Sequence, residues 1–247
     1  MNKALIFVLL LSPLLGQDAD SALKHAREVN LERAAKLPSF IADEYVTRFK
    51  SRHVNPQDWK FADTIESELE VHGDRFQRQN TRINGKAWNK PSFPSFTWSV
   101  SFGEELKPLF DPKCHTAMEF DRREENGLAY KFKTPPGCFG GFTVQTTVLV
   151  VSNTKRYQPE WFGRFLIDPA GNVVQFENNA NRFPKGFGAD PWKSISTWDY
   201  VVIGDAKHLL PVKLEIFGGF TKTDLWHVVV EYKNHRHFES SSDITFK

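Results

Sequence analysis

An alternation of apolar and polar side chains with a period of two runs through most of the chain after residue 58. It is clearest over 59–72, where one side of the predicted strand carries Trp59, Phe61, Ile65, Leu69 and Val71. The other side is polar and includes Glu66, Glu68 and Glu70. This pattern is typical of an antiparallel sheet that is covered on one face and open to water on the other. We expect the next strand, 75–83, to place Arg75, Arg78 and Arg82 opposite the glutamates.

The same pattern predicts a large sheet. Asn84-Gly85 and Asn126-Gly127 favour tight hairpin turns, because both central residues must adopt positive φ angles. Helices are predicted only over 21–36, ended by Pro38, and briefly over 103–110. The other predicted strands are 96–102, 116–122, 128–133, 142–152, 161–167, 173–177, 198–203, 209–217, 225–238 and 242–246. Strands and helices do not alternate, so the predicted fold class is α+β and β-dominated, with an N-terminal helix on a mainly antiparallel sheet of about eleven strands.

The first 16 residues have the layout of a cleavable signal peptide. Lys3 gives a short positive start, Ala4–Leu11 is an uncharged apolar run, and Ser12-Pro13 interrupts it before Gly16. The run is too short to cross a bilayer as a helix, which takes roughly 20 residues. We expect cleavage after Gly16, or alternatively within 19–22, and export to the periplasm or the medium. Residues 17–247 are then one domain, with no transmembrane segment expected.

Composition narrows the range of partners. The formal net charge of the chain is +2, and Lys3 is the one charged residue of the predicted signal, which leaves +1 in the mature chain. Because there is no large basic excess, nucleic acid is not an expected partner. Aromatic residues make up 14% of the chain, enough for a thick aromatic sheet face or an aromatic-lined cavity.

Cys114 and Cys138 are the two cysteines of the chain. They flank a predicted hairpin, and an exported protein meets oxidising conditions in which a disulfide persists. We therefore predict a Cys114–Cys138 disulfide, which stabilises the fold by about 3 kcal/mol if the effect is mainly on the entropy of the unfolded chain. The alternative, a metal site with His115, lacks further ligands at a suitable spacing.

A family resemblance rests on the exported start, the N-terminal helix, the long meandering strands and two C-terminal blocks. The blocks are His208-Leu209-Leu210-Pro211-Val212 and Glu231-Tyr232-Lys233-Asn234-His235-Arg236-His237-Phe238. With these features the chain resembles the periplasmic lipoprotein-carrier superfamily, the half-barrel group that includes outer-membrane lipoprotein-sorting proteins, and secreted bacterial proteins that carry the same tail. The resemblance implies a strongly curved sheet with acyl chains bound in its hollow. The chain has fewer helical segments than the carriers, and no residue matches their ligand-contacting positions.

The aromatic residues have two interpretations, namely the core of the sheet or the lining of an apolar ligand pocket. The residues that we expect to line such a pocket are Trp59, Phe61, Phe96, Trp98, Phe102, Trp198, Tyr200 and Trp226. No cofactor is expected. A segment over 183–192, rich in Pro and Gly, is predicted to be a loop that covers the pocket.

An alternative site consists of His227, His235 and His237, which have the same parity on the last long strand. A His-x-His pair with a third histidine can hold zinc or another transition metal. The stripe of Glu66, Glu68 and Glu70 is better explained as a surface that forms salt bridges than as a pair of catalytic carboxylates. The sequence has no Gly-x-Ser-x-Gly nucleophile elbow, no His-Glu-x-x-His helix and no phosphate loop.

Three functional hypotheses follow. The leading one is a non-enzymatic envelope protein that binds or carries an apolar, acyl-bearing ligand. The second is a metal-dependent hydrolase that uses the three histidines. The third is an envelope protein-interaction domain without a ligand pocket.

Overall fold

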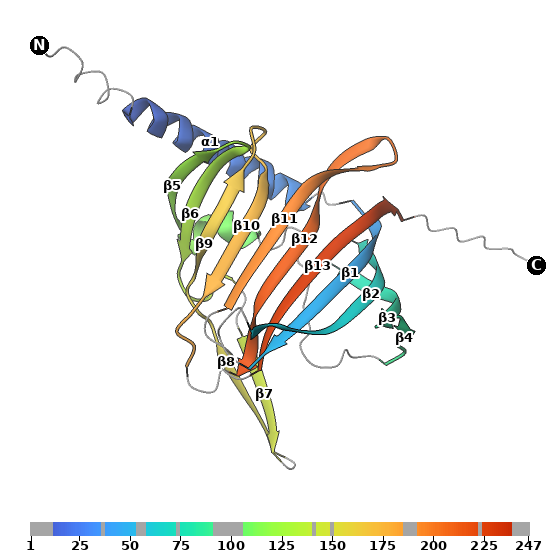
Figure 1. Ribbon diagram of the computed structural model, residues 1–247. Coiled ribbons are helices and arrows are strands. Elements are labelled where there is room, and N and C mark those ends of the chain that lie inside the picture. Colours follow the sequence, from blue (N-terminus) through green and yellow to red (C-terminus); the bar gives the residue numbers. More distant parts are fainter. Residues whose placement is uncertain are drawn as a thin grey trace, which may run out of the picture.

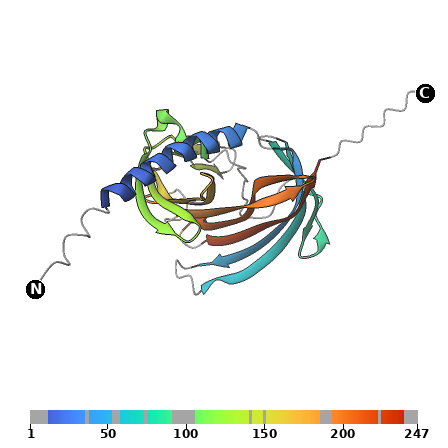
Figure 2. The same cartoon turned by 90° about the horizontal axis from the view of Figure 1, so that it is seen from above.

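In the described residues, eleven strands form one antiparallel sheet that curves without closing (Figures 1 and 2). The computed structural model describes residues 12–35, 38–52, 58–72, 75–90, 106–139, 142–148, 151–184, 192–221 and 224–238. The strands of the sheet are β1 (Phe40–Ser51), β2 (Lys60–His72), β3 (Arg75–Ile83), β4 (Lys86–Ala87), β5 (Ala117–Glu124), β6 (Gly127–Thr134), β9 (Trp161–Ile167), β10 (Val173–Ala180), β11 (Trp192–Ile203), β12 (Ala206–Thr221) and β13 (Asp224–His237). The predicted fold class is confirmed, and the open curved sheet is a half-barrel.

The strand order is β4-β3-β2-β1-β13-β12-β11-β10-β9-β6-β5. Neighbours in this order are also consecutive in the chain except at β1–β13 and at β6–β9. The chain between β6 and β9 forms a separate hairpin of β7 (Phe142–Val148) and β8 (Val151–Tyr157). The single strand predicted over 142–152 is therefore wrong, because the chain reverses after Val148 and Val151 pairs with it.

Helix α1 (Ser12–Ala35) lies on the side towards which the sheet curves (Figure 2). It begins nine residues before the predicted start at residue 21. The buried Asn30 side chain fixes it to the β9–β10 turn: its amide donates to the carbonyl oxygen of Gly171 at 2.8 Å, and its carbonyl oxygen accepts from the backbone N–H of Val173 at 3.0 Å. The short helix α2 (Leu106–Phe110), predicted within 103–110, buries Leu109 and Phe110 in the same region.

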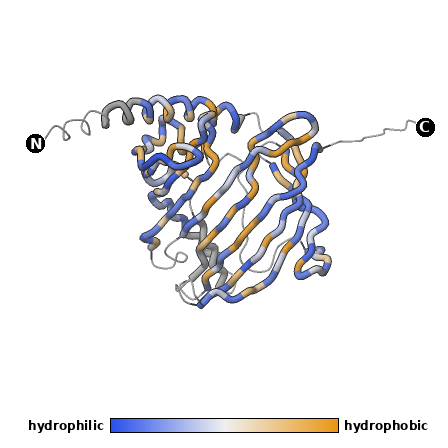
Figure 3. The backbone as a smooth tube through the Cα atoms, turned by 45° about the horizontal axis from the view of Figure 1, so that its top comes forward, coloured by the Kyte–Doolittle hydropathy of each residue, from blue (hydrophilic) through white to orange (hydrophobic). Residues whose placement is uncertain are grey.

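The inner face of the sheet, defined as the face on which α1 lies, carries two apolar clusters. Alternate residues of each strand reach it, as the alternation of colours along the strands in Figure 3 illustrates. The first cluster spans β1, β2, β11, β12 and β13, and the second joins β6, β9 and β10 to α1 and α2. In the second cluster Tyr130, Phe165 and Phe176 are buried, and Tyr130 donates its hydroxyl to the carbonyl oxygen of Ala19 at 2.6 Å.

The Cys114–Cys138 disulfide is present, with its Cα atoms 5.4 Å apart. It joins the 3₁₀ turn η2 (Pro112–Cys114), which follows α2, to the turn that follows β6. Among the described residues, no helix combines the length and the apolar character that crossing a membrane requires. The predicted strands over 96–102 and 242–246 lie outside the described residues, as does most of the predicted loop 183–192.

Candidate functional site

The first apolar cluster covers the inner face of one half of the sheet. Its side chains come from β1, β2 and β11–β13 and stack across neighbouring strands, as in the row Ile65, Val46, Val230 and Leu214. The members are Phe40, Ala42, Val46, Ile65, Leu69, Val71, Ile203, Leu210, Leu214, Ile216, Trp226, Val228, Val230 and Tyr232. This surface is the best candidate in the described residues for binding an apolar molecule, because it is broad, mainly apolar and on the concave side of the sheet.

Charged residues interrupt this surface on β1. Glu44 faces inward between Ala42 and Val46 and is fully buried. Its carboxylate accepts hydrogen bonds from the guanidinium of Arg78, at 2.5 Å from Nε and 2.9 Å from Nη2, and from the Ser67 hydroxyl at 2.8 Å. A buried carboxylate is tolerated only with such partners, because an isolated charge in an apolar environment is very costly.

Arg48 forms a second buried ion pair two positions further along the inward side of β1. Its Nε and Nη2 atoms each donate to Asp63 at 2.6 Å, and its guanidinium lies 5.3 Å from the ring centroid of Trp226. Lys50, the next inward residue, lies 5.0 Å from the same ring and 3.0 Å from Asp224. The indole of Trp226 therefore has two cations over it, an arrangement that the ring quadrupole favours.

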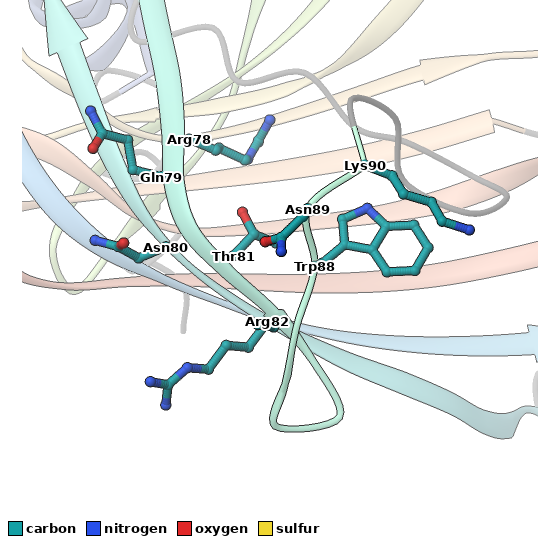
Figure 4. Close-up of a pocket in the computed structure, with 9 residues that line it drawn as sticks. Arg78, Gln79, Asn80, Thr81, Arg82, Trp88, Asn89 and Lys90 are labelled. Atoms are coloured by element: carbon teal, nitrogen blue, oxygen red, sulfur yellow. The ribbon is translucent and has the colours of Figure 1, made fainter.

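An open pocket of about 800 Å³ lies at the β3–β4 rim of the same half of the sheet (Figure 4). Its described lining includes Arg78, Arg82 and Lys90 and no carboxylate. Arg78 and Arg82 point to opposite sides of β3 (Figure 4), and Lys90 lies 5.2 Å from the ring of Trp88. Because Arg78 is already paired with Glu44, Arg82 and Lys90 supply the positive charge of this rim, which suits an anionic or polar group on a ligand.

The expected pocket residues are distributed over both faces of the sheet. Trp226 and Trp198 are buried on the inner face, in the first and second cluster respectively. Tyr200 is exposed, and its hydroxyl donates to Asp168 at 2.9 Å. Trp59 and Phe61 lie on the outer face, while Phe96, Trp98 and Phe102 lie outside the described residues. Of this set, Trp226 lies against the buried Arg48 of β1.

A β-bulge explains why Trp59 and Phe61 are on the outer face. In the β1–β2 register Arg48 pairs with Asp63 but Phe49 pairs with Phe61, which leaves Ala62 as an extra residue. One extra residue reverses the side to which all residues beyond it point. The prediction that residues 59–71 share one apolar face is therefore wrong at its beginning.

The three histidines of the metal hypothesis do not come together. Ile41 pairs with Arg236 but Asp43 pairs with Lys233, so β13 has an extra residue near Asn234, whose φ is 53°. His235 consequently contacts the buried Phe40 ring, whereas His227 lies on the outer face between Phe49 and Phe217. The expectation that they share a face is wrong, and the described residues contain no group of metal-binding side chains.

The glutamate stripe forms polar contacts on the outer face, as expected. Glu68 accepts from Arg236, and Glu70 accepts from Gln79 at 2.7 Å. Arg78, expected beside these glutamates, pairs instead with Glu44 on the inner face. The cause is a bulge at Asn80, whose φ is 51° and which is skipped between the pairs Glu66–Arg82 and Glu68–Gln79.

Sequence reasoning missed Glu44 and Arg48 because β1 was not predicted, and it therefore gave no partner to Asp63 on the predicted β2 strand. Its inward positions alternate between apolar and charged residues, so neither side of the strand is uniformly apolar. Two of the bulges have a feature that is visible in the sequence. Asn80 and Asn234 are asparagines, a residue type that adopts positive φ angles more readily than most non-glycine residues.

No family model matches the chain, and no curated protein matches its sequence. Among solved structures, the chain is similar to a LolA superfamily protein from Nitrosomonas europaea, with 10% identity, a TM-score of 0.35 and coverage of 93% of this chain and 97% of that one. It is also similar to a DUF1329 family protein from Desulfovibrio piger, with 10% identity, a TM-score of 0.40 and coverage of 92% and 97%. The first belongs to the half-barrel group that the sequence resembles. At these TM-scores the likeness supports no conclusion about family membership or function.

Proposed function

We propose that this protein is a non-enzymatic binder of an apolar, acyl-bearing ligand, which lies along the inner face of β1, β2 and β11–β13. The observation that carries the proposal is the broad, mainly apolar surface of the first cluster on the concave side of an open sheet. Burial of hydrocarbon stabilises such a complex by about 0.8 kcal/mol per methylene group. Affinity is therefore expected to rise with the length of the acyl chain.

The positive rim supports a ligand with a polar or anionic head. Arg78 joins the two parts of the site, since it lines the β3–β4 pocket and also pairs with Glu44 within the apolar surface. The residues of the first cluster are already buried without a ligand. Entry of an acyl chain therefore requires a rearrangement that uncovers them, and the polar head remains at the rim.

Export to the periplasm or the medium is part of this proposal. The Cys114–Cys138 disulfide supports it, because structural disulfides persist in oxidising compartments and are rare in the cytosol. An acyl-bearing ligand also suits an envelope protein, since a free acyl chain must be shielded from water between membranes.

The test combines native mass spectrometry after mild purification with titration of a fluorescent fatty acid. We expect co-purified lipid or saturable fatty-acid binding to the wild-type protein. Leu214→Asn places an amide on the inner face and should weaken binding, whereas Val229→Asn, on the outer face of the neighbouring strand, should not. Circular dichroism establishes that both variants fold. Wild-type protein with neither lipid nor fatty-acid binding contradicts the proposal, whatever the variants do.

A second candidate, a protein-interaction domain without a ligand pocket, is favoured by one observation. The side chains of the first cluster have at most 9% of their surface exposed, as in an ordinary filled core. The same titration separates the two candidates, since an interaction domain with a filled core binds no fatty acid.

A further inference from the structure

A group of aromatic rings in mutual contact lies on the outer face of the sheet, which is otherwise charged. Phe49 and Phe61 meet edge to face at 6.3 Å between ring centroids, and Phe49 stacks on His227 at 5.5 Å. Phe217 stacks on the other side of His227 at 4.1 Å, and Trp59 approaches the same ring at 5.9 Å. We call these five residues the aromatic patch. They come from the end of β1, the start of β2 with the residue before it, the later part of β12 and the start of β13.

The centre of the aromatic patch is partly buried and its edge is exposed. Burial lowers the pKa of His227, although Glu215 at 3.5 Å acts in the opposite direction, so the ring between the two phenyl groups is mainly neutral at pH 7. Lys213 holds Glu215 at 2.5 Å on the same face. Phe61, in contrast, has 60% of its surface exposed, which is unusual for a phenyl ring that its neighbours could have covered. The patch therefore presents an apolar side chain to an outside partner.

Basic residues meet the aromatic patch at the strand ends, although Lys50 and its register partner Lys60 belong to the inner side of the sheet. An open pocket of about 1010 Å³ is lined by Phe61 together with Lys50, Arg52 and Lys60. Two acids, Asp58 and Asp224, line it as well, and Asp224 is held by Lys50 at 3.0 Å. Within the described part of the chain, Arg52 and Lys60 have no carboxylate partner. This side of the patch therefore carries an excess of positive charge.

The aromatic patch and its basic border lie at the end of the half-barrel opposite α1, where β12, β13, β1 and β2 meet in the lower part of Figure 1. The β7–β8 hairpin extends beyond the main sheet at the same end (Figure 1), and β7 has no charged residue in its sequence. An exposed phenyl ring, an indole, two cations without a carboxylate partner among the described residues, and an uncharged strand thus share one end of the molecule.

We propose that this end binds the surface of a bilayer that contains anionic lipids. Aromatic rings are favoured at the depth of the lipid head groups, and each Lys or Arg near an anionic surface adds about 1 kcal/mol of attraction. Phe61 enters the interface, while Arg52 and Lys60 contact lipid phosphates. The inference does not depend on the apolar ligand, because the aromatic patch is on the outer face and the proposed ligand site is on the inner one.

Sedimentation of the full protein with vesicles tests this proposal. The probes are vesicles of phosphatidylcholine alone and of phosphatidylcholine mixed with phosphatidylglycerol. We expect binding to the mixed vesicles that weakens as salt is added, because salt screens the attraction of exposed charges. Equal binding to both kinds of vesicle, or no binding to either, overturns the proposal; absence of binding is also the outcome if the patch is a docking site for a protein.

Substitutions identify the residues that contact the bilayer. Phe61→Ser should lower the partition coefficient on mixed vesicles about tenfold, the loss expected for a phenyl ring that is partly buried in the interface. Arg52→Gln combined with Lys60→Gln should have a similar effect at low salt and a smaller one at high salt. Val202→Ser is the matched control, since Val202 is equally exposed, at 62%, but lies beside the β11–β12 turn at the other end.

The fatty-acid titration keeps this proposal separate from the proposed function. Phe61→Ser should bind fatty acid like the wild type while it loses vesicle binding, since its phenyl ring is exposed and the inner face is untouched. If Phe61→Ser and Val202→Ser bind mixed vesicles equally well, the aromatic patch is not the contact surface and the inference fails, even if fatty acid is bound.

Discussion

Glu44 and Arg48 are charged side chains on an inner face that is mainly apolar, and each is held by a partner with two hydrogen bonds. Such pairs contribute little net stability compared with well-packed apolar residues, because both charges lose their hydration on burial. Removal of one partner is different, since it leaves the other charge buried and uncompensated. The two pairs therefore fix the positions of Arg78 and Asp63 more than they stabilise the fold.

Glu44→Ala is expected to lower the free energy of unfolding by about 3–5 kcal/mol, because it leaves the Arg78 guanidinium without its carboxylate. Urea denaturation followed by circular dichroism measures the change. Glu231→Ala is the control, since it breaks the exposed Glu231–Lys233 pair of β13 and should have little effect. Equal losses in the two variants would mean that the Glu44–Arg78 pair is no more important than a surface pair.

Single residues also limit what the sequence predicts about the site. Trp226 was expected to face the candidate pocket and does lie on the inner face, because no bulge separates it from the regular part of β13. Phe61, Arg78 and His235 each lie beyond a bulge, so a strict period of two assigns their side chains to the wrong face of the sheet. A bulge depends on one residue with unusual backbone geometry, which alternation of hydrophobicity cannot detect.

Among the elements, α1 shows how a terminal segment becomes part of the core. Ala19 and Ala26 are buried in the second cluster, and Asn30 satisfies the backbone carbonyl of Gly171 in the β9–β10 turn and the backbone N–H of Val173 at the start of β10. Removal of residues up to Gly16 would leave these contacts intact. Removal of residues up to Ala22 would delete Ala19 and with it the hydrogen bond from Tyr130.

The mature protein is therefore expected to begin at Gln17, the first of the two cleavage positions considered for the signal peptide. Intact-mass measurement of protein exported by a bacterial host identifies the first residue. A mass that corresponds to residues 23–247 contradicts the prediction, and so does a full-length mass of exported protein. Unexported protein from the same cells, which should retain residue 1, is the control.

Prediction of elements succeeded where both the period and the turn were regular. The bounds of β3 and β9 agree with the predicted 75–83 and 161–167, and Asn84-Gly85 adopts the positive φ angles that its turn requires. β1 was not predicted because Glu44 and Arg48 occupy inward positions, so apolar and charged residues are mixed on the same side of the strand. The candidate surface was thus predicted in part, while the strand at its centre was not.

At the scale of the whole molecule, the Cys114–Cys138 disulfide closes a loop of 24 residues in the half that contains α1 and α2. The double variant Cys114→Ala/Cys138→Ala is expected to unfold at a lower urea concentration, with a loss of about 3 kcal/mol. Wild-type protein in reductant is the matched comparison, since it loses the crosslink and keeps the side chains. An unchanged midpoint in both samples would show that the bond does not stabilise the native state.

The pairing of β1 with β13 has a consequence for the order of assembly. Among the described strands, the meander β4-β3-β2-β1 joins the rest of the sheet only through β13, which is the last of them in the chain. The ribosome synthesises Phe40–Ser51 long before Asp224–His237. Until β13 has been made, the edge of β1 that will face it has no partner for its backbone hydrogen bonds. Contacts between residues so distant in sequence slow folding. A chain truncated before residue 224 would therefore lack the seam that unites its two halves.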